Sequence, residues 1–181
     1  MSEVHIKLLN RPPCKSFDCG NDSINKLVIN DSYFSKITQF AYTWEITCEG
    51  KVLGYCMVKM KSIYLDECPD DISDYSSDII DRYSAVEIKF LAIDKRYQGK
   101  HIGTYTLAHM IRKIEKMSTE WPIRLIHIDA LKDKAHIYEK IGFQYYNRND
   151  FNNDDPTIRM YRDCITAVNF NALEQFAGEQ L

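Results

Sequence analysis

The stretch from residue 85 to residue 131 limits the fold most, because strand, loop, helix and strand patterns follow one another in it. "AVEIKFLAI" (residues 85–93) and "PIRLIHIDAL" (residues 122–131) are apolar runs with the character of buried strands. Between them, "IGTYTLAHMIRKIEKMS" (residues 102–118) places its apolar side chains at helical spacing. A right-handed crossover through this helix would make the two strands parallel neighbours. The sequence therefore predicts an α/β fold with a parallel centre.

The remaining segments predict antiparallel strands and shorter helices around this centre. By their apolar spacing, the expected strands are residues 4–9, a hairpin over 41–65, and a closing pair at 143–148 and 157–162. The expected helices are residues 23–37 and 132–142, the second of which ends at Gly142. Together these elements predict one mixed sheet, an α+β arrangement built on the parallel centre.

The domain organisation follows from the length and the lack of a linker. The chain has 181 residues, which is enough for one sizeable core. We expect a single domain over residues 1–162. Residues 163–181 then form a tail, with a helix around residues 170–176.

Composition excludes some classes of protein. The formal net charge of -3 gives no global argument for nucleic-acid binding. No apolar run approaches the roughly 20 residues that span a membrane, and the first residues lack the layout of a signal peptide. We therefore expect a cytoplasmic protein without a membrane association.

The six cysteines do not form the pairs that metal sites use. Cys48 and Cys56 lie in apolar strand patterns and are interpreted as core residues. A disulfide between Cys14 and Cys19 stays open, although a reducing compartment disfavours it. We expect no metal ligands in this chain.

The loop between the first central strand and the helix has the properties of an anion site. The first N–H groups of a helix have no partner within it, and the helix dipole adds partial positive charge there. Gly99 and Gly103 allow a close approach of the main chain, and the bases near them are Lys95, Arg96 and Lys100. A phosphate or pyrophosphate suits such a loop. The glycine spacing of "GKHIG" fits neither a P-loop nor a dinucleotide motif.

Two motifs in this order resemble the GNAT superfamily of acyl-CoA N-acyltransferases. "QGKHIG" (residues 98–103) resembles its phosphate loop, Q/R-x-x-G-x-G/A, and "LAI" before it resembles the end of its fourth strand. "HIYEKIGF" (residues 136–143) resembles the later motif, in which an aliphatic residue and a tyrosine are followed by three further residues and then by Gly-Phe. The resemblance covers roughly residues 4–162.

The resemblance implies a GNAT-like fold, whose sheet splays between its fourth and fifth strands, and acetyl-CoA as the cofactor, with coenzyme A as product. Unpaired main-chain groups of the fourth strand would bind the pantetheine arm. The implied cofactor-binding residues are Leu91, Ala92, Ile93, Arg96, Gln98, Gly99, Lys100, His101, Ile102, Gly103, Thr104 and Tyr138.

The resemblance also implies direct attack of an amine on the thioester. Tyr138 matches the family's tyrosine and is expected to protonate the leaving thiolate. A main-chain N–H near Leu91 or Ala92 would stabilise the oxyanion. Glu87 is the leading candidate for the base, directly or through water, although it would equally form a surface pair with Lys89.

Three histidines and one aspartate raise further questions. His127 and Asp129, on the second central strand, are alternatives for the base, and His136 is expected on a helix surface. His101 occupies the place of the loop's central glycine, where it would either crowd the pyrophosphate or donate a hydrogen bond to it.

The acceptor is the least determined part of the prediction. "DALKDKAHIYEKIGF" and "FDCGNDSINKLV" resemble a GNAT subgroup that includes toxins of toxin–antitoxin pairs, which acetylate aminoacyl-tRNA. Because the chain is net acidic, we expect a small-molecule or peptide amine instead, and tRNA second. The acidic residues 66–81 are interpreted as a solvated loop or as a lip that attracts a cationic acceptor. A non-catalytic acyl-CoA-binding module and a homodimer also stay open.

Overall fold

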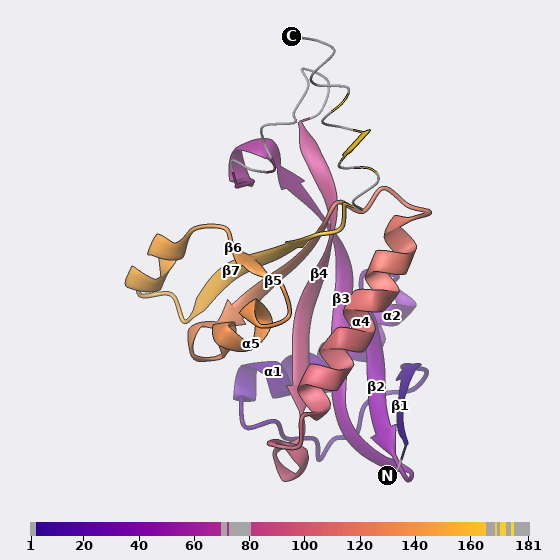
Figure 1. Cartoon of the computed structure of the whole chain (residues 1–181). Helices are drawn as coiled ribbons and strands as arrows, with labels where there is room; N and C mark the ends of the chain where they lie inside the picture. Colours follow the sequence, from indigo (N-terminus) through magenta and orange to yellow (C-terminus); the bar gives the residue numbers. More distant parts are fainter. Residues whose placement is uncertain are drawn as a thin grey trace. The chain divides into compact units, whose positions relative to one another are not determined.

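The computed structural model describes residues 3–69, 72, 81–165, 169, 171–172 and 175. It confirms the mixed α/β fold class (Figure 1). Hydrogen bonds join the strands in the order β1-β2-β3-β4-β5-β7-β6, and β4 and β5 form the predicted parallel centre. The strands are β1 (Val4–Leu8), β2 (Tyr42–Cys48), β3 (Lys51–Tyr64), β4 (Arg82–Ile93), β5 (Leu125–Leu131), β6 (Gln144–Tyr145) and β7 (Thr157–Asp163).

The helices differ from the expected ones mainly near the N-terminus. The expected helix at residues 23–37 is divided into α1 (Asp22–Lys26), a π-helical turn (Leu27–Asp31) and α2 (Ser32–Ile37). α4 (Ile102–Ser118) has the bounds that the sequence predicts, and α5 (Ala135–Glu139) is shorter than expected. Short 3-10 turns occupy Leu65–Glu67, Lys95–Tyr97, Lys132–Lys134 and Arg148–Asn152.

The chain forms two compact units, each built from two separate stretches. The first contains Met1–Met60 and Val86–Lys113, and the second contains Lys61–Ala85 and Ile114–Leu181. The predicted splay between β4 and β5 concerns how these units sit relative to each other, and it stays a prediction. The expected single domain over residues 1–162 also stays a prediction.

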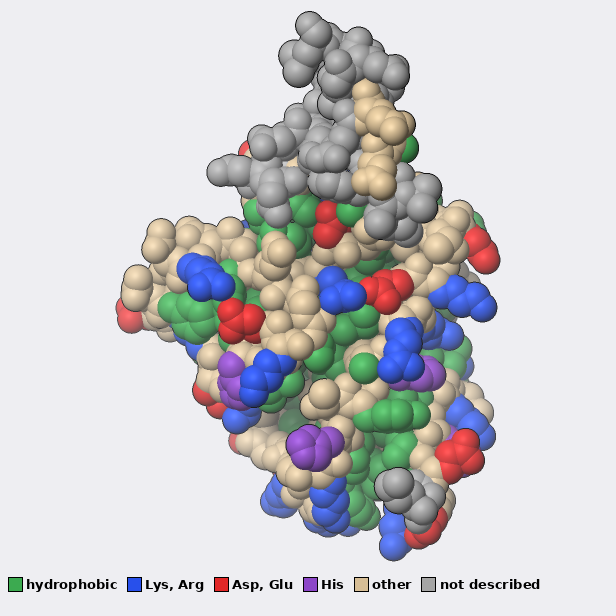
Figure 2. Space-filling model, in the orientation of Figure 1, with side chains coloured by type: hydrophobic (Ala, Val, Ile, Leu, Met, Phe, Trp, Pro, Cys, Tyr) green, Lys and Arg blue, Asp and Glu red, His purple; other side chains and the backbone are tan. Residues whose placement is uncertain are grey.

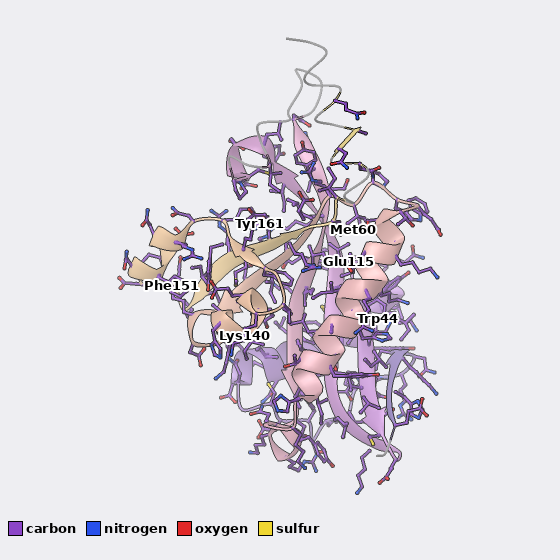
Figure 3. All side chains as sticks on the ribbon, viewed as in Figure 1. Trp44, Met60, Glu115, Lys140, Phe151 and Tyr161 are labelled. Carbon is purple, nitrogen blue, oxygen red and sulfur yellow. The ribbon has the colours of Figure 1, made fainter. Side chains whose placement is uncertain are left out.

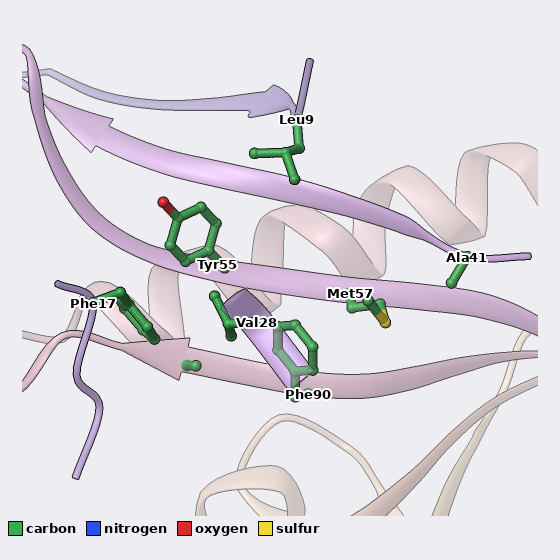
Figure 4. Packing of buried hydrophobic residues seen from close by; sticks show 8 residues of the cluster. Leu9, Phe17, Val28, Ala41, Tyr55, Met57 and Phe90 are labelled. Carbon is green, nitrogen blue, oxygen red and sulfur yellow. The ribbon is translucent and has the colours of Figure 1, made fainter. Parts of the chain in front are cut away.

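The core of the first unit lies between its strands and the helical segment that contains Val28 (Figure 4). Tyr55 and Phe17 pack edge to face, with ring centroids 5.0 Å apart. Burial raises the pKa of Tyr55 to about 12, and its hydroxyl accepts a hydrogen bond from the Cys14 N–H. This core therefore fixes the loop of residues 10–21 against β3.

Gly54 on β3 allows the C-terminal end of β4 to lie very close to β3. A Cβ atom at Gly54 would lie 2.3 Å from the carbonyl oxygen of Ala92. A glycine is required here, because any other side chain would push β4 away. Asp94 N–H then donates to Leu53 O at 2.8 Å, which holds the point where β4 ends and the loop begins.

In the second unit, β7 pairs antiparallel with β5 from Leu125↔Asp163 to Leu131↔Thr157, and with β6 at its other edge. The predicted closing pair is therefore confirmed. The core of this unit contains Ile63, Ile72, Ala85, Leu125 and Tyr161. The start of β4 belongs to it, because Arg124 N–H donates to Ser84 O at 2.9 Å.

Several expectations concern residues that the structure does not describe. Asp70, Asp71, Asp74 and Asp78 of the acidic stretch lie outside the described residues, and so does most of the expected tail helix. Among the described residues, no helix is long and apolar enough to cross a membrane, and no group of three His, Cys, Asp or Glu residues could hold a metal ion. Cys14 and Cys19 are free thiols.

Candidate functional site

The loop between β4 and α4 turns twice through the left-handed region. Gly99 has φ 75°, and His101 has φ 59°. α4 begins at Ile102. The first helical hydrogen bond runs from the Tyr105 N–H to the carbonyl oxygen of His101, at 3.0 Å. Among the described residues, none accepts a hydrogen bond from the main-chain N–H groups of residues 99–104. These free donors at a helix start fit a ligand made of acceptors, such as a pyrophosphate.

His101 is the unusual residue of this loop. Its left-handed backbone explains why a glycine is expected at this place, because a Cβ atom makes that conformation less favourable by about 1 kcal/mol or more. The side chain is exposed.

Carboxylates neutralise two of the three loop bases. Arg96 donates from Nε and Nη2 to the two oxygens of Asp94, both at 2.8 Å, and the Arg96 N–H also donates to Oδ1 at 3.0 Å. Asp94 is only 2% exposed. The hydrogen bonds from the Arg96 side chain lower the pKa of Asp94 below its usual value. This pair shapes the turn that leads into the loop.

Lys95 forms an ion pair with Asp18 across the unit. Hydrogen bonds from Lys95, from the Gly20 N–H and from Asn25 lower the pKa of Asp18 to about 2. Lys100 instead lies with its Nζ 5.6 Å from the centre of the Tyr97 ring. Of the three bases, Lys100 alone has no carboxylate partner among the described residues.

Gln98 holds the loop rather than presenting its amide outward. Its Nε2 donates to Cys19 O and to Ile93 O, both at 2.9 Å. Both donors of the side chain are therefore used within the protein. The other expected cofactor-binding residues of this unit lie where the sequence predicts, on the end of β4 (Leu91, Ala92 and Ile93) and in the first turn of α4 (Ile102, Gly103 and Thr104).

Glu87 is buried on β4 rather than at the surface. Its side chain is 5% exposed, and it lies 3.4 Å from Lys59 Nζ and 3.6 Å from Lys89 Nζ. The expected pair with Lys89 is present, and β3 adds the second lysine from the neighbouring strand. Two ammonium groups compensate the desolvation of this buried carboxylate.

Tyr138 belongs to the second unit, on the last turn of α5. Its carbonyl oxygen accepts from the Ile141 and Phe143 N–H groups, both at 3.1 Å, and its ring packs edge to face on Phe143. Gly142 makes this reversal with φ 89°, and a Cβ there would lie 2.2 Å from Arg162 Nη1. The Gly-Phe part of the motif therefore fixes the end of the helix that carries the tyrosine.

His127 is buried in a polar cluster of the second unit, with 2% exposure. Lys61 Nζ lies 2.8 Å from its Nε2, and Tyr146 Oη lies 3.2 Å from its Nδ1. Asp129 Oδ1 lies 3.4 Å from Nε2. His136 is exposed, as expected.

The candidate residues thus fall into two groups. The loop and Glu87 lie in the first unit, and Tyr138, His127 and Asp129 lie in the second. That they meet around one ligand stays a prediction.

Comparison with known proteins decides the family. The sequence profile of the acetyltransferase (GNAT) domain matches residues 40–145, more than half of the chain. The chain belongs to the GNAT acetyltransferase family. The matched range contains both motifs of this GNAT domain, the loop and Tyr138. No curated protein matches the chain.

Solved structures share the fold of this GNAT domain. A bacterial toxin has a TM-score of 0.78 at 18% identity, covering 96% of this chain and 97% of that one. AtaT complexed with acetyl-methionyl-tRNAfMet has a TM-score of 0.73 at 20% identity, covering 89% and 95%. AtaTR bound with AcCoA has a TM-score of 0.72 at 19% identity, covering 96% and 97%.

Proposed function

We propose that this GNAT domain transfers the acetyl group of acetyl-CoA to a primary amine. The loop carries the proposal, because its main-chain N–H groups at residues 99–104 have no acceptor among the described residues and suit a pyrophosphate. Family membership supports the same donor, and a solved structure of similar fold, AtaTR, is bound with AcCoA.

Acetyl-CoA would supply a thioester that an amine attacks directly. In the proposed assignment, the loop N–H groups and the N-terminal end of α4 hold the pyrophosphate, and Lys100 adds the one loop charge that no described carboxylate neutralises. Arg96 acts indirectly, by fixing the turn through Asp94. Gln98 does the same through its bonds to Cys19 and Ile93.

Proton transfer needs one donor and one acceptor. Tyr138 is proposed to give its phenolic proton to the sulfur of the leaving thiolate. The attacking ammonium must lose a proton, and the candidates are Glu87, directly or through water, and His127 with Asp129. A Glu87→Gln and a His127→Gln variant separate them, because removal of the base abolishes the acidic limb of the pH–rate profile.

We propose aminoacyl-tRNA as the acceptor, with a small amine as the second candidate. Support comes from a neighbour of similar fold that is complexed with acetyl-methionyl-tRNAfMet, and that covers 89% of this chain. The net charge of -3 favours a small amine over tRNA. It does not weigh against the present proposal, because the sum over a chain does not describe the face that meets the RNA.

Thermal unfolding and thiol release test the enzymatic proposal. Saturating acetyl-CoA should raise the unfolding temperature, because it binds the folded state only. Tyr138→Phe should keep that shift but lower turnover by about 10²-fold or more, since only the proton donor is lost. The absence of a shift with the wild type would contradict the cofactor, and an unchanged rate in Tyr138→Phe would remove Tyr138 from the mechanism.

A further inference from the structure

The exposed side of α4 carries a continuous basic stripe that the GNAT motifs do not use. Residues 105, 109, 112, 113 and 116 fall within about 100° of one another around the helix. All five side chains are exposed: Tyr105, His109, Arg112, Lys113 and Lys116. In the space-filling view, Lys, Arg and His side chains gather over α4 beside apolar surface (Figure 2).

The bases of this stripe are not neutralised. Among the described residues, no carboxylate lies within ion-pair distance of Arg112, Lys113 or Lys116. Glu115, the acidic residue of this part of α4, pairs with Arg162 Nη2 at 2.8 Å instead. Charges left without partners on one face create a positive potential that attracts an anion.

Aromatic side chains lie next to these bases. Lys113 Nζ is 5.9 Å from the centre of the Trp44 ring on β2, and Tyr42 meets Trp44 edge to face at 6.4 Å. Trp44 lies beside α4 in Figure 3. Tyr42 is 42% exposed. Bases interleaved with partly exposed aromatic rings are the pattern of surfaces that bind a sugar–phosphate backbone and stack its bases.

We propose that this face, formed by His109, Arg112, Lys113, Trp44 and Tyr42, binds the acceptor RNA. The stripe from residue 105 to 116 is about 16 Å long, which is the span of several phosphates along one strand. A second copy of the chain fits less well, because a two-fold interface would place like charges opposite each other. The charges and rings of this face would attract any polyanion. The inference rests on the proposed function in one respect only, because the proposed acceptor is the reason for choosing RNA.

Binding of RNA without turnover tests the inference. The probe is a fluorescent RNA hairpin that copies a tRNA acceptor stem with its single-stranded end, followed by anisotropy at several salt concentrations. Arg112→Glu/Lys113→Glu should weaken binding at least about tenfold and flatten the salt dependence by about 1.5 in logarithmic slope. The matched control is Lys51→Glu/Lys140→Glu, which changes the same charge at two other exposed lysines. It should bind like the wild type.

Trp44 gives a second readout that does not depend on reversed charges. The chain has two tryptophans, Trp44 and Trp121, so a Trp121→Phe variant leaves Trp44 as the sole indole. Its fluorescence should be quenched when the RNA hairpin binds. Equal affinities in the two double variants, or a Trp44 signal that RNA leaves unchanged, would overturn the inference.

A failure of the RNA-binding face can be distinguished from a failure of the proposed acetyltransferase activity. Acetyl-CoA should raise the unfolding temperature of Arg112→Glu/Lys113→Glu as much as that of the wild type, since the loop is intact. If the hairpin distinguishes the variants while no acetyl-CoA shift appears, the enzymatic proposal fails and the RNA surface stands. If the shift appears and the hairpin does not distinguish them, the RNA surface fails alone.

Discussion

Two sets of basic residues lie in one continuous stretch of the first unit, and the fold treats them differently. Lys95 and Arg96, before the loop, are held by Asp18 and Asp94. Arg112 and Lys113, on α4, have no carboxylate partner among the described residues. The first set therefore gives the loop its shape and leaves ligand binding largely to the main chain. The second set is free to meet an anion from outside.

This difference is invisible to a count of charges. The formal net charge of the whole chain is -3. Two of its carboxylates, however, form ion pairs with the loop bases, so they do not neutralise the basic stripe on α4. Net charge describes solubility and long-range attraction, whereas recognition depends on which charges remain unpaired on one face.

The largest expected difference between the two sets of bases concerns stability, and Asp94 is the residue that reveals it. Asp94→Ala removes three hydrogen bonds from a side chain that is 2% exposed, so it should lower the free energy of unfolding by about 2 kcal/mol. Arg112→Ala should change it by no more than about 0.5 kcal/mol, because this exposed base has no partner to lose. Urea denaturation measures both. Equal losses in the two variants would mean that the paired and unpaired bases do not differ in structural role.

The elements of this unit could largely be predicted, and the pairing of its charges could not. Strand and helix patterns predicted the end of β4 and the bounds of α4 correctly, since periodicity is local, although β4 begins at Arg82 rather than at residue 85. The Asp18–Lys95 pair and the bond from Gln98 to Cys19 O join distant segments, so no local pattern indicates them. Helical periodicity alone places Arg112 and Lys113 on the exposed side of α4. The lack of acidic neighbours depends on segments remote in sequence, so it could not be predicted.

The site of the second unit shows the same limit. The motif around Tyr138 predicted the short helix and the role of Gly142 at its end. It did not predict that Arg162 closes this reversal through Ile141 O at 2.8 Å, because β7 is remote in sequence. The burial of Glu87 between two lysines could not be predicted either, because Lys59 comes from the neighbouring strand.

His101 lies in the part of the loop that is expected to bind the pyrophosphate, and two substitutions there separate its effect on stability from its effect on binding. His101→Gly should be more stable than His101→Ala by about 1 kcal/mol, because only glycine adopts φ 59° without a Cβ penalty. The affinity for coenzyme A separates the two roles of the imidazole. If it donates to a phosphate, both variants bind less tightly than the wild type; if it crowds the phosphate, His101→Gly binds more tightly. Equal stability of the two variants would contradict the strained backbone.

The smallest expected effect is the loss of stability at low pH when the ion pair between Asp18 and Lys95 is broken. The pKa of Asp18 is lowered from 3.8 to about 2, so its pair with Lys95 stabilises the fold fully above pH 4. That stabilisation decreases as the pH falls below about 4 and is lost as the pH passes through about 2, where the carboxylate in the folded protein becomes protonated. The wild type should therefore unfold at a higher temperature than Asp18→Asn at pH 6, and this difference should be much smaller at pH 2. A gap that persists unchanged at pH 2 would show that the ion pair is not its source.

Transfer of labelled acetyl groups to charged tRNA is the measurement that decides whether this protein acetylates aminoacyl-tRNA. Bulk tRNA charged with amino acids is incubated with the protein and radiolabelled acetyl-CoA, and the RNA is then precipitated and counted. We predict label in the RNA fraction that is released by hydrolysis of the aminoacyl ester, is lost in Tyr138→Phe and is reduced in Arg112→Glu/Lys113→Glu. Label that never enters charged tRNA, from a protein that acetyl-CoA stabilises, would contradict the proposed acceptor.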